Sequence, residues 1–363
     1  MLSGVLTLVR SAVALLCLAL LPATAGVGGV PVLPAGAVME VERAAHTATR
    51  LADGRVLVTG GIRAGEAALA NAELYDPRTR KFSATGAMTS VRSGHTATLL
   101  RSGLVLVAGG WDDDAPLRTA ELYDPATGRF ARTGPLTAPR AGAAATLLRD
   151  GRVLVAGGYD GSRSLASADL YDPDKGRFSR TGAMRAPRAA YTATRLRDGR
   201  VLVTGGDTPD RVLRSAEIYD PLTGRFSATG SLTIRRHKHA AALLRDGRVL
   251  VLGGSDERDW GSRYRSAELF DPRAGRFSRT GMLSQARFKL ADAVAVTPSG
   301  TVLVAGGAQV VDRFRGGRFL PVARLDAARY FSTATLLRGG ALLIVGGYDR
   351  SITPTARSFL YQP

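Results

Sequence analysis

The sequence predicts an all-β protein built from seven copies of one small antiparallel unit. A short apolar run that ends on two glycines, as in residues 55–61, occurs seven times. Five of the six steps between successive glycine pairs are 48 to 53 residues long, and the last is 40. A fixed period of this length indicates an array of one supersecondary unit. The pairs are Gly60-Gly61, Gly109-Gly110, Gly157-Gly158, Gly205-Gly206, Gly253-Gly254, Gly306-Gly307 and Gly346-Gly347.

The second unit illustrates the four strands, which we call A, B, C and D in chain order. Residues 95–100 alternate between small or polar and apolar side chains, which predicts strand A. Ser102-Gly103 follows, where most other units carry Asp-Gly, a strong signal for a tight hairpin turn. Residues 104–107 are continuously apolar and predict a strand B that is covered on both faces.

The second half of the unit is a second hairpin. Residues 120–123 predict strand C, which Asp124-Pro125 ends, and strand D starts near Phe130 and ends around Gly134. A four-stranded sheet of this size cannot bury both of its faces alone. Neighbouring units must therefore cover each other.

Paired glycines after an apolar strand, a Tyr-Asp-Pro end to strand C, an aromatic residue opening strand D and an arginine before strand A resemble the kelch repeat. The resemblance extends over residues 30–363 and implies a β-propeller of seven four-stranded blades. Phenylalanine stands where many kelch repeats carry tryptophan, as in the bacterial variety, and this leaves the expected fold unchanged.

The two ends of the array predict how the ring closes. The last unit ends with a degenerate strand C at residues 356–363, and no strand D follows it. Residues 30–39 precede the first strand A and occupy the place of a strand D. We expect this amino-terminal strand to complete the seventh blade and cover its open edge. In the sixth unit residues 312–315 replace the usual strand C motif, so its outer strands should be the least regular.

Residues 1–25 have the pattern of a secretory signal peptide, with cleavage expected after Ala25. The alternatives are an uncleaved anchor and a lipidated Cys17, although Leu16 is too large for a lipoprotein signal. The propeller would then span residues 26–363, with no membrane span and no cysteine. We expect a secreted, periplasmic or extracellular protein that forms no disulfide.

The formal net charge of +18 favours acidic partners, such as an anionic glycan or a negatively charged surface. The alternative is a diffuse charge, because basic residues occur in every unit without a dense basic run. We therefore expect no sequence-specific nucleic-acid binding. The expected partner is an unidentified protein or an acidic glycan, and the expected state is a monomer.

Strand direction places the D-to-A connections and the B-to-C loops on one face, where the loops vary most between units. Variable loops on a repeated scaffold commonly bind ligands. The loop candidates are Trp111, Asp112, Tyr159, Asp207, Trp260 and Tyr348. The D-to-A connections contribute an arginine in every unit: Arg43, Arg92, Arg140, Arg188, Arg236, Arg287 and Arg329. These arginines are either paired with acidic B-to-C loops or free to bind a carboxylate or sulfate.

His46, His95 and His239 share one repeat position with Tyr191, and we expect these four side chains to line the channel. Because the histidines come from distant units, we expect neither a metal site nor a cofactor. Galactose oxidase has a similar seven-bladed kelch ring, but its copper cofactor requires a tyrosine cross-linked to a cysteine. The loss of Cys17 with the signal excludes that chemistry.

The leading hypothesis is an exported, non-catalytic propeller that binds a carbohydrate or a protein through its loop face. The alternative is a carbohydrate-active enzyme resembling the kelch-type sialic acid mutarotase, in which arginine holds the sugar carboxylate and Asp or Glu moves a proton. A carboxyl group of raised pKa beside an unpaired arginine would favour the enzyme. Salt bridges to every arginine would favour a scaffold or a binding protein.

Overall fold

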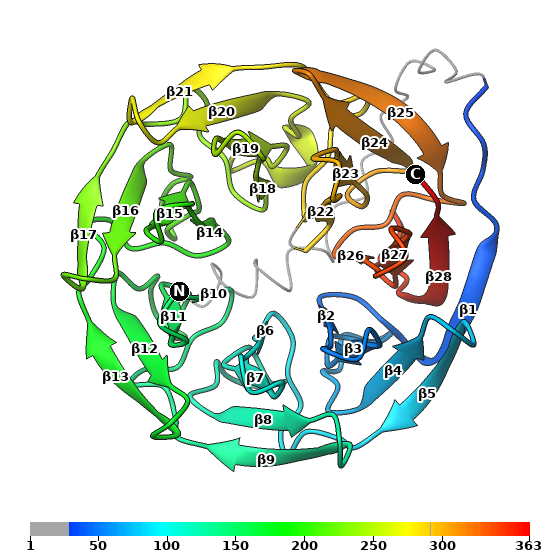
Figure 1. Ribbon diagram of the computed structural model, residues 1–363, viewed down its shortest axis with the longest axis horizontal. Helices are drawn as coiled ribbons and strands as arrows, with labels where there is room; N and C mark the ends of the chain where they lie inside the picture. The colour runs from blue at the N-terminus through cyan, green and yellow to red at the C-terminus, as the bar shows by residue number, and fades with distance from the viewer. Residues whose placement is uncertain (1–28, 291) are drawn as a thin grey trace.

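The computed structural model describes residues 29–290 and 292–363, which form seven four-stranded antiparallel sheets arranged in a ring (Figure 1). This arrangement confirms the predicted all-β, seven-bladed β-propeller. The described residues contain one short 3₁₀ helix, η1 (Asp259–Gly261), in a B-to-C loop. None of their helices is long and apolar enough to cross a membrane. The predicted signal segment, residues 1–25, lies outside the described residues.

Each blade runs from an inner strand A to an outer strand D. Blades one to three are β2 (Thr47–Arg50), β3 (Val56–Thr59), β4 (Ala72–Asp76) and β5 (Lys81–Thr85); β6 (Thr96–Leu99), β7 (Val105–Ala108), β8 (Ala120–Asp124) and β9 (Arg129–Thr133); and β10 (Ala144–Leu147), β11 (Val153–Ala156), β12 (Ala168–Asp172) and β13 (Arg177–Thr181).

The remaining blades follow the same order. Blades four to six are β14 (Thr192–Arg195), β15 (Val201–Thr204), β16 (Ala216–Asp220) and β17 (Arg225–Ala228); β18 (Ala240–Leu243), β19 (Val249–Leu252), β20 (Ala267–Asp271) and β21 (Arg276–Arg279); and β22 (Val294–Val296), β23 (Val302–Val304), β24 (Val310–Arg315) and β25 (Arg318–Arg324). Blade seven is β26 (Thr333–Leu336), β27 (Leu342–Val345), β28 (Thr355–Tyr361) and β1 (Ala35–Arg43).

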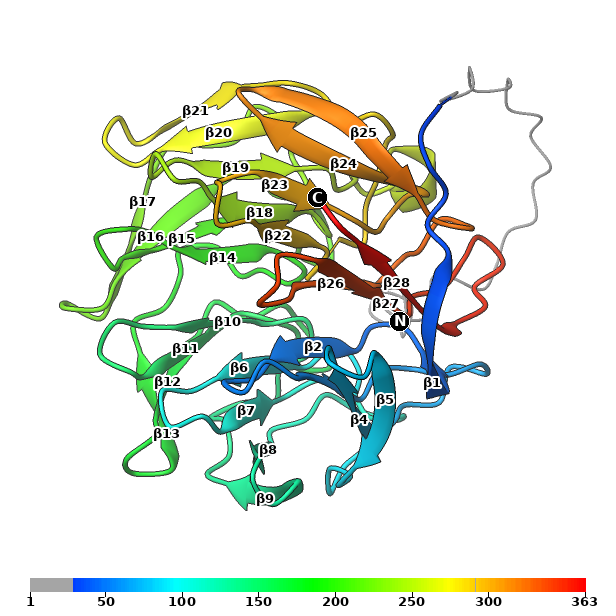
Figure 2. The same ribbon diagram turned by 45° about the vertical axis from the view of Figure 1, so that its right-hand side comes forward.

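Blade seven closes the ring as predicted, because β1 pairs antiparallel with β28. Ala35 lies opposite Phe359, and Figure 2 shows β1 on the outside of the ring beside β28. The strand begins later than the predicted segment and extends to Arg43. The two ends of the described chain therefore share one sheet, which leaves no unpaired edge on β28.

The outer strands of the sixth blade are irregular, as the sequence predicts, but they are not the least regular. The pairing of β24 with β25 shifts register once, between Val311 and Asp312, whereas the pairing of β28 with β1 in blade seven shifts register twice. The C–D pairs of blades one to five keep one register. Both strands are also longer than their counterparts in blades one to five. The loss of the Asp-Pro turn therefore extends this hairpin.

The hydrophobic core lies between neighbouring blades. Every residue of strand B is buried in each blade, as expected for a strand covered on both faces. Between blades two and three, for example, Leu106 and Ala108 pack in one cluster with Val153 and Val155. Each sheet thus supplies apolar surface to the next, and no single blade carries its own core.

The glycine pairs occur where the backbones of neighbouring segments approach closely. Gly60 has a φ of 59°, and a Cβ atom on it would lie 2.5 Å from the carbonyl oxygen of Arg92. Both the left-handed conformation and the lack of space exclude a side chain at this position.

One residue of each D-to-A connection, two positions after the repeat arginine, belongs to a backbone ring around the upper end of the channel. All seven have a φ between 49° and 61°. We call them the rim residues: Ala45, Gly94, Gly142, Ala190, Lys238, Lys289 and Phe331. The N–H of one rim residue donates to the carbonyl of the preceding blade's rim residue at 2.9 to 3.2 Å, except that Leu290 rather than Lys289 donates to Lys238, at 3.3 Å. The backbone of the rim is therefore fixed by hydrogen bonds in all seven blades.

Candidate functional site

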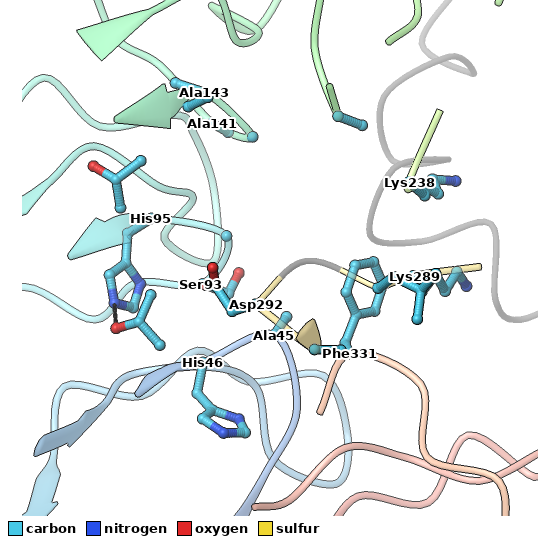
Figure 3. A pocket seen from close by; sticks show the side chains of 18 of the residues that line it. Ala45, His46, Ser93, His95, Ala141, Ala143, Lys238, Lys289, Asp292 and Phe331 are labelled. Atoms are coloured by element: carbon cyan, nitrogen blue, oxygen red, sulfur yellow. Dashed lines mark hydrogen bonds between the residues drawn. The ribbon is translucent and has the colours of Figure 1, made fainter. Parts of the chain in front are cut away.

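A cavity of about 380 Å³ occupies the upper part of the channel. Its wall consists of the rim residues and the starts of the inner strands, which include Tyr191 and three histidines. Trp111, Tyr159 and Tyr348 reach it from the B-to-C loops. Figure 3 shows His46, His95, Lys238, Lys289, Asp292 and Phe331 around this pocket. Residues from all seven blades thus meet at one opening.

The rim residues make the opening asymmetric. In blades one to four they are alanine or glycine, whereas blades five to seven carry Lys238, Lys289 and Phe331. Because all seven rim residues share one backbone conformation, the difference lies in their side chains. The rim residues of blades one to four are therefore small and uncharged, whereas two lysines and a phenyl ring line the opening in blades five to seven.

The Lys289 side chain lies among four aromatic rings. Its ammonium nitrogen lies 5.0 to 5.4 Å from the ring centroids of Trp260, Phe288, Phe331 and Tyr348, and it donates a hydrogen bond to the Tyr348 hydroxyl at 2.6 Å. Burial, and then the charge of Lys238, lower the pKa of Lys289 to about 7, while the charge of Asp259 opposes this shift. Lys289 forms no ion pair with any described carboxylate.

Lys238 belongs to a charged network beside Lys289. Its ammonium group lies 2.6 Å from Asp259, which also accepts from His237 at 2.9 Å. The other ring nitrogen of His237 lies 2.7 Å from Asp207. Burial alone would lower the pKa of His237, but the two carboxylates outweigh burial and raise it. This network links the B-to-C loops of blades four and five to the rim.

The opposite wall of the opening offers aromatic surface. The Trp111 and Tyr159 rings stack with centroids 6.3 Å apart and an interplanar angle of 25°. Asp292, at the start of blade six, also lines the cavity, and its side chain is exposed there. The surrounding protein raises the pKa of Asp292 by desolvation. The cavity therefore combines a stacking surface, a carboxyl group and a cation without an anionic partner.

The three channel histidines bridge neighbouring blades. His95 lies 3.0 Å from the hydroxyl of Thr47 in the preceding blade, and His46 and His239 make corresponding contacts with threonines. Burial, followed by the charge of Arg92, lowers the pKa of His95 to about 3. Burial also lowers the pKa of His46 and His239 well below the ordinary value. These neutral histidines therefore hold adjacent inner strands together.

The repeat arginines lie inside the blades, and their guanidinium groups do not line the cavity. Six of them are at most 1% exposed and Arg329 is 6% exposed. All seven form a salt bridge: Arg43–Glu73 (2.8 Å), Arg92–Glu121 (2.8 Å), Arg140–Asp169 (3.3 Å), Arg188–Glu217 (2.7 Å), Arg236–Glu268 (3.0 Å), Arg287–Asp312 (2.6 Å) and Arg329–Asp326 (2.7 Å).

The expectation that acidic B-to-C loops pair with these arginines was wrong. In six blades the partner is the carboxylate of strand C, as in Arg188–Glu217. Glu217 also accepts the backbone N–H of Arg185 at 2.8 Å, and Arg188 donates to the Gly205 carbonyl at 2.6 Å. Each pair thus satisfies backbone groups of the D-to-A connection and the glycine pair. The alternative, that these arginines are free to bind a carboxylate or sulfate, was also wrong, because all seven are paired within the protein.

Three other loop candidates lie outside the cavity lining. Asp112 accepts the backbone N–H groups of Asp114 and Ala115 and so stabilises its own loop. Asp207 binds His237, and Trp260 packs edge-on against Phe288 at 4.9 Å. These three side chains support the wall of the site without lining it.

Sequence reasoning missed the two lysines, Glu66 and Asp292, which are the Lys, Glu and Asp residues of the cavity lining. The available signal was the residue two positions after each repeat arginine. This position holds alanine or glycine in four units but Lys238, Lys289 and Phe331 in the last three. A side chain that departs from the repeat at a fixed position marks a functional difference between blades.

Seven four-stranded sheets around an axial cavity define this protein as a β-propeller. Residues 92–137 and 139–185 match the family model of the Kelch motif. The chain is therefore a seven-bladed β-propeller in which two segments match the Kelch motif. A search of curated protein sequences found no similar protein.

Among solved structures, the chain is similar to a novel fungal alcohol oxidase with catalytic diversity among the AA5 family, in complex with copper. The TM-score is 0.73 and the identity is 15%, over 92% of this chain and 76% of that chain. This likeness concerns the fold. The described residues include no cysteine and no group of three or more His, Cys, Asp or Glu side chains that could hold a metal ion. Copper chemistry does not fit them and enters no step below.

Proposed function

We propose that this propeller is a non-catalytic binding protein whose upper cavity takes an acidic carbohydrate. The observation that carries the proposal is Lys289, a cavity-lining cation that has no ion pair with a described carboxylate. A ligand carboxylate beside it would supply that partner and favour the protonated amine. The stacked rings of Trp111 and Tyr159 suit the apolar face of a sugar ring.

The arginine pairing supports binding over catalysis. The enzyme hypothesis requires an unpaired arginine at the opening to hold a substrate carboxylate. All seven repeat arginines instead form salt bridges within the blades. Salt bridges to every repeat arginine are what the sequence analysis expects of a scaffold or a binding protein.

The test is calorimetric titration of residues 26–363 with galacturonate and sialic acid oligosaccharides and with their methyl esters. Lys289→Met should weaken binding of the free acids about tenfold or more, since it removes a charge-assisted contact. Trp111→Ala should weaken the binding of the free acids and of their methyl esters to the same extent. Lys81→Met removes an exposed lysine on β5 and serves as the charge control. Equal affinity for acid and ester, or no effect of either cavity variant, would contradict the proposal.

The affinity should also depend on pH in a defined direction. Burial gives free Lys289 a pKa of about 7, so the amine loses its charge as pH rises through that value. Binding of a carboxylate should therefore weaken above about pH 7 in the wild type. Lys289→Met should remove this dependence. An unchanged pH profile in the variant would assign the acid binding to another group.

One observation favours a second candidate, an enzyme that interconverts the anomers of an acidic sugar. Asp292 and Lys289 line the same cavity, and their pKa values shift toward each other, which is typical of an acid–base pair. Anomer exchange measured by saturation-transfer NMR would then be accelerated by the wild type and abolished in Asp292→Asn. No acceleration by the wild type rules this candidate out.

Export is proposed from the sequence alone. The amino-terminal segment has the pattern of a secretory signal, and cleavage is expected after Ala25. The mass of the protein recovered from the producing cells tests this directly. A mature chain that begins at Gly26 supports export, whereas a full-length chain in the cytoplasm contradicts it.

A further inference from the structure

The opposite face of the propeller carries a separate set of charges. Strand A is the innermost strand of every blade, so the seven A-to-B turns surround the lower end of the channel (Figure 1). These turns are residues 51–55, 101–104, 149–152, 196–200, 245–248, 297–301 and 338–341. They contain nine arginines and four aspartates. Part of the net positive charge is therefore concentrated around one opening.

Five arginines occupy one repeat position within these turns, and we call them the turn arginines: Arg101, Arg149, Arg197, Arg245 and Arg338. All five side chains are exposed. The equivalent positions in blades one and six hold Ala52 and Pro298. The set is a ring with two gaps.

Each turn arginine lies across the turn of the following blade. The stem of Arg149 is the nearest group to Gly199, and the corresponding glycines beside the other four are Gly54, Gly151, Gly247 and Gly300. The guanidinium group of Arg101 donates to the carbonyl of Arg149, and that of Arg149 to the carbonyl of Arg197. Packing and hydrogen bonding thus hold these side chains in place, which reduces the entropy lost when they bind a ligand.

The aspartates of the same turns do not neutralise the turn arginines. Each aspartate is paired with the arginine two residues later: Asp53–Arg55, Asp150–Arg152, Asp198–Arg200 and Asp246–Arg248, at 2.6 to 2.7 Å. No turn arginine forms an ion pair with any described carboxylate. A guanidinium group has five N–H donors, so Arg101, Arg149 and Arg338 keep donors for an anion after each has bonded to a carbonyl of the following turn.

We propose that the turn arginines form a binding site for an anionic polysaccharide bearing sulfate or carboxylate groups. A chain of spaced anionic groups fits a ring of spaced guanidinium groups, each able to bind an oxyanion through two N–H donors. Single-stranded nucleic acid fits less well, because it binds through exposed aromatic side chains that stack on its bases. The large exposed apolar residues of the described chain are Val32, Val38, Leu222, Met282 and Leu320, and none is aromatic.

The test compares two quadruple variants that lose the same charge. The ring variant is Arg101→Gln, Arg149→Gln, Arg197→Gln and Arg245→Gln. The control replaces four exposed arginines of the outer strands: Arg132→Gln, Arg180→Gln, Arg225→Gln and Arg279→Gln. Binding of a heparin decasaccharide and of polygalacturonate is measured at about 150 mM salt, where long-range attraction is largely screened. Polygalacturonate carries carboxylates alone and heparin carries sulfates as well, so the comparison shows whether sulfate groups are needed for binding.

The ring variant should lose about 30-fold in affinity, or about 2 kcal/mol, for at least one probe. The control should lose less than about threefold. Equal losses would mean generic charge attraction and would overturn the proposal. Tighter binding of duplex DNA than of either polysaccharide would overturn the assigned ligand. Polygalacturonate also fits the acidic ligand proposed for the upper cavity, so both probes are measured with Lys289→Met as well. A loss of heparin binding in Lys289→Met as large as in the ring variant would place the site in the cavity and overturn the proposal.

A gain-of-function variant keeps the proposal testable if the ring variant fails to fold. Ala52 is exposed and stands at one gap of the ring, and nothing lies within 4 Å of a Cβ atom placed on Gly103 in the following turn. Ala52→Arg should therefore place a sixth turn arginine in free space and strengthen binding about twofold or more. Ala52→Gln is the matched control. If Ala52→Arg and Ala52→Gln bind the polysaccharide with equal affinity, this result would contradict a binding site formed by the turn arginines.

Discussion

The buried salt bridge between Arg188 and Glu217 gives a quantitative prediction about stability. Both side chains are at most 3% exposed, and their charged atoms lie 2.7 Å apart. Glu217→Gln keeps the size of the side chain but leaves the Arg188 charge without compensation. Breaking one buried pair in this way costs about 3–5 kcal/mol. With an unfolding entropy of roughly 2.1 cal/mol/K per residue, a loss of about 4 kcal/mol lowers the Tm of this chain by about 6 °C.

The assay is urea unfolding followed by tryptophan fluorescence, with calorimetry for the Tm. Asp198→Asn is the matched control, because it makes the same chemical change in an exposed salt bridge and should cost less than about 1 kcal/mol. Arg188→Met and the double variant complete the cycle, with an expected coupling energy of about 2 kcal/mol. If Glu217→Gln destabilises no more than Asp198→Asn, the repeat arginines do not hold the blades together as described.

Three further predictions follow from the fold. Folding lowers the pKa of Lys289 from 10.5 to about 7, so the unfolded chain binds more protons than the folded chain between pH 7 and pH 10.5. The free energy of unfolding should therefore rise with pH over this range. In chemical denaturation curves, Lys289→Met should flatten this rise and stabilise the protein at about pH 6. Deletion of residues 26–39 removes most of β1 from β28 and should give aggregation by light scattering, and a soluble truncation of unchanged Tm would refute the closure. Gly157→Ala places a Cβ atom 2.5 Å from the carbonyl oxygen of Arg188, at a residue with a φ of 58°. In urea unfolding it should lower the free energy of unfolding by about 2 kcal/mol or more. Gly65→Ala, in a loop where nothing lies within 4 Å of the added Cβ atom, is the control for backbone strain without a clash.

The architecture could be predicted because its signals are local and repeated. Each Asp-Gly turn, apolar strand B and glycine pair specifies the same hairpin, so seven weak signals support one another. The two chain ends completed this prediction, because the seventh unit lacks a strand D and residues 30–39 precede the first strand A in the place of a strand D. The boundaries of β1 were less certain because hydrogen bonding to a distant strand, and not local pattern, decides where it ends.

The partners of the repeat arginines could not be predicted in the same way. Glu217 and its equivalents recur with the arginines at the period of the repeat, but periodicity does not show which charges meet. The pairing depends on how strand C of one blade lies beside the connection that enters it. The cavity charges were missed for the opposite reason. Lys238, Lys289 and Asp292 depart from the repeat, but they lie outside the B-to-C loops, which vary most between units and supplied the loop candidates.

The shared seventh sheet also sets the order in which the molecule can be assembled. β1 must wait for β28, which pairs with it from the far end of the described chain. A growing or partly translocated polypeptide can therefore complete six sheets but not the last, and its leading strand remains without a partner until residue 361 is free. Any chaperone that protects this protein during synthesis would have to shield that strand for longer than any other.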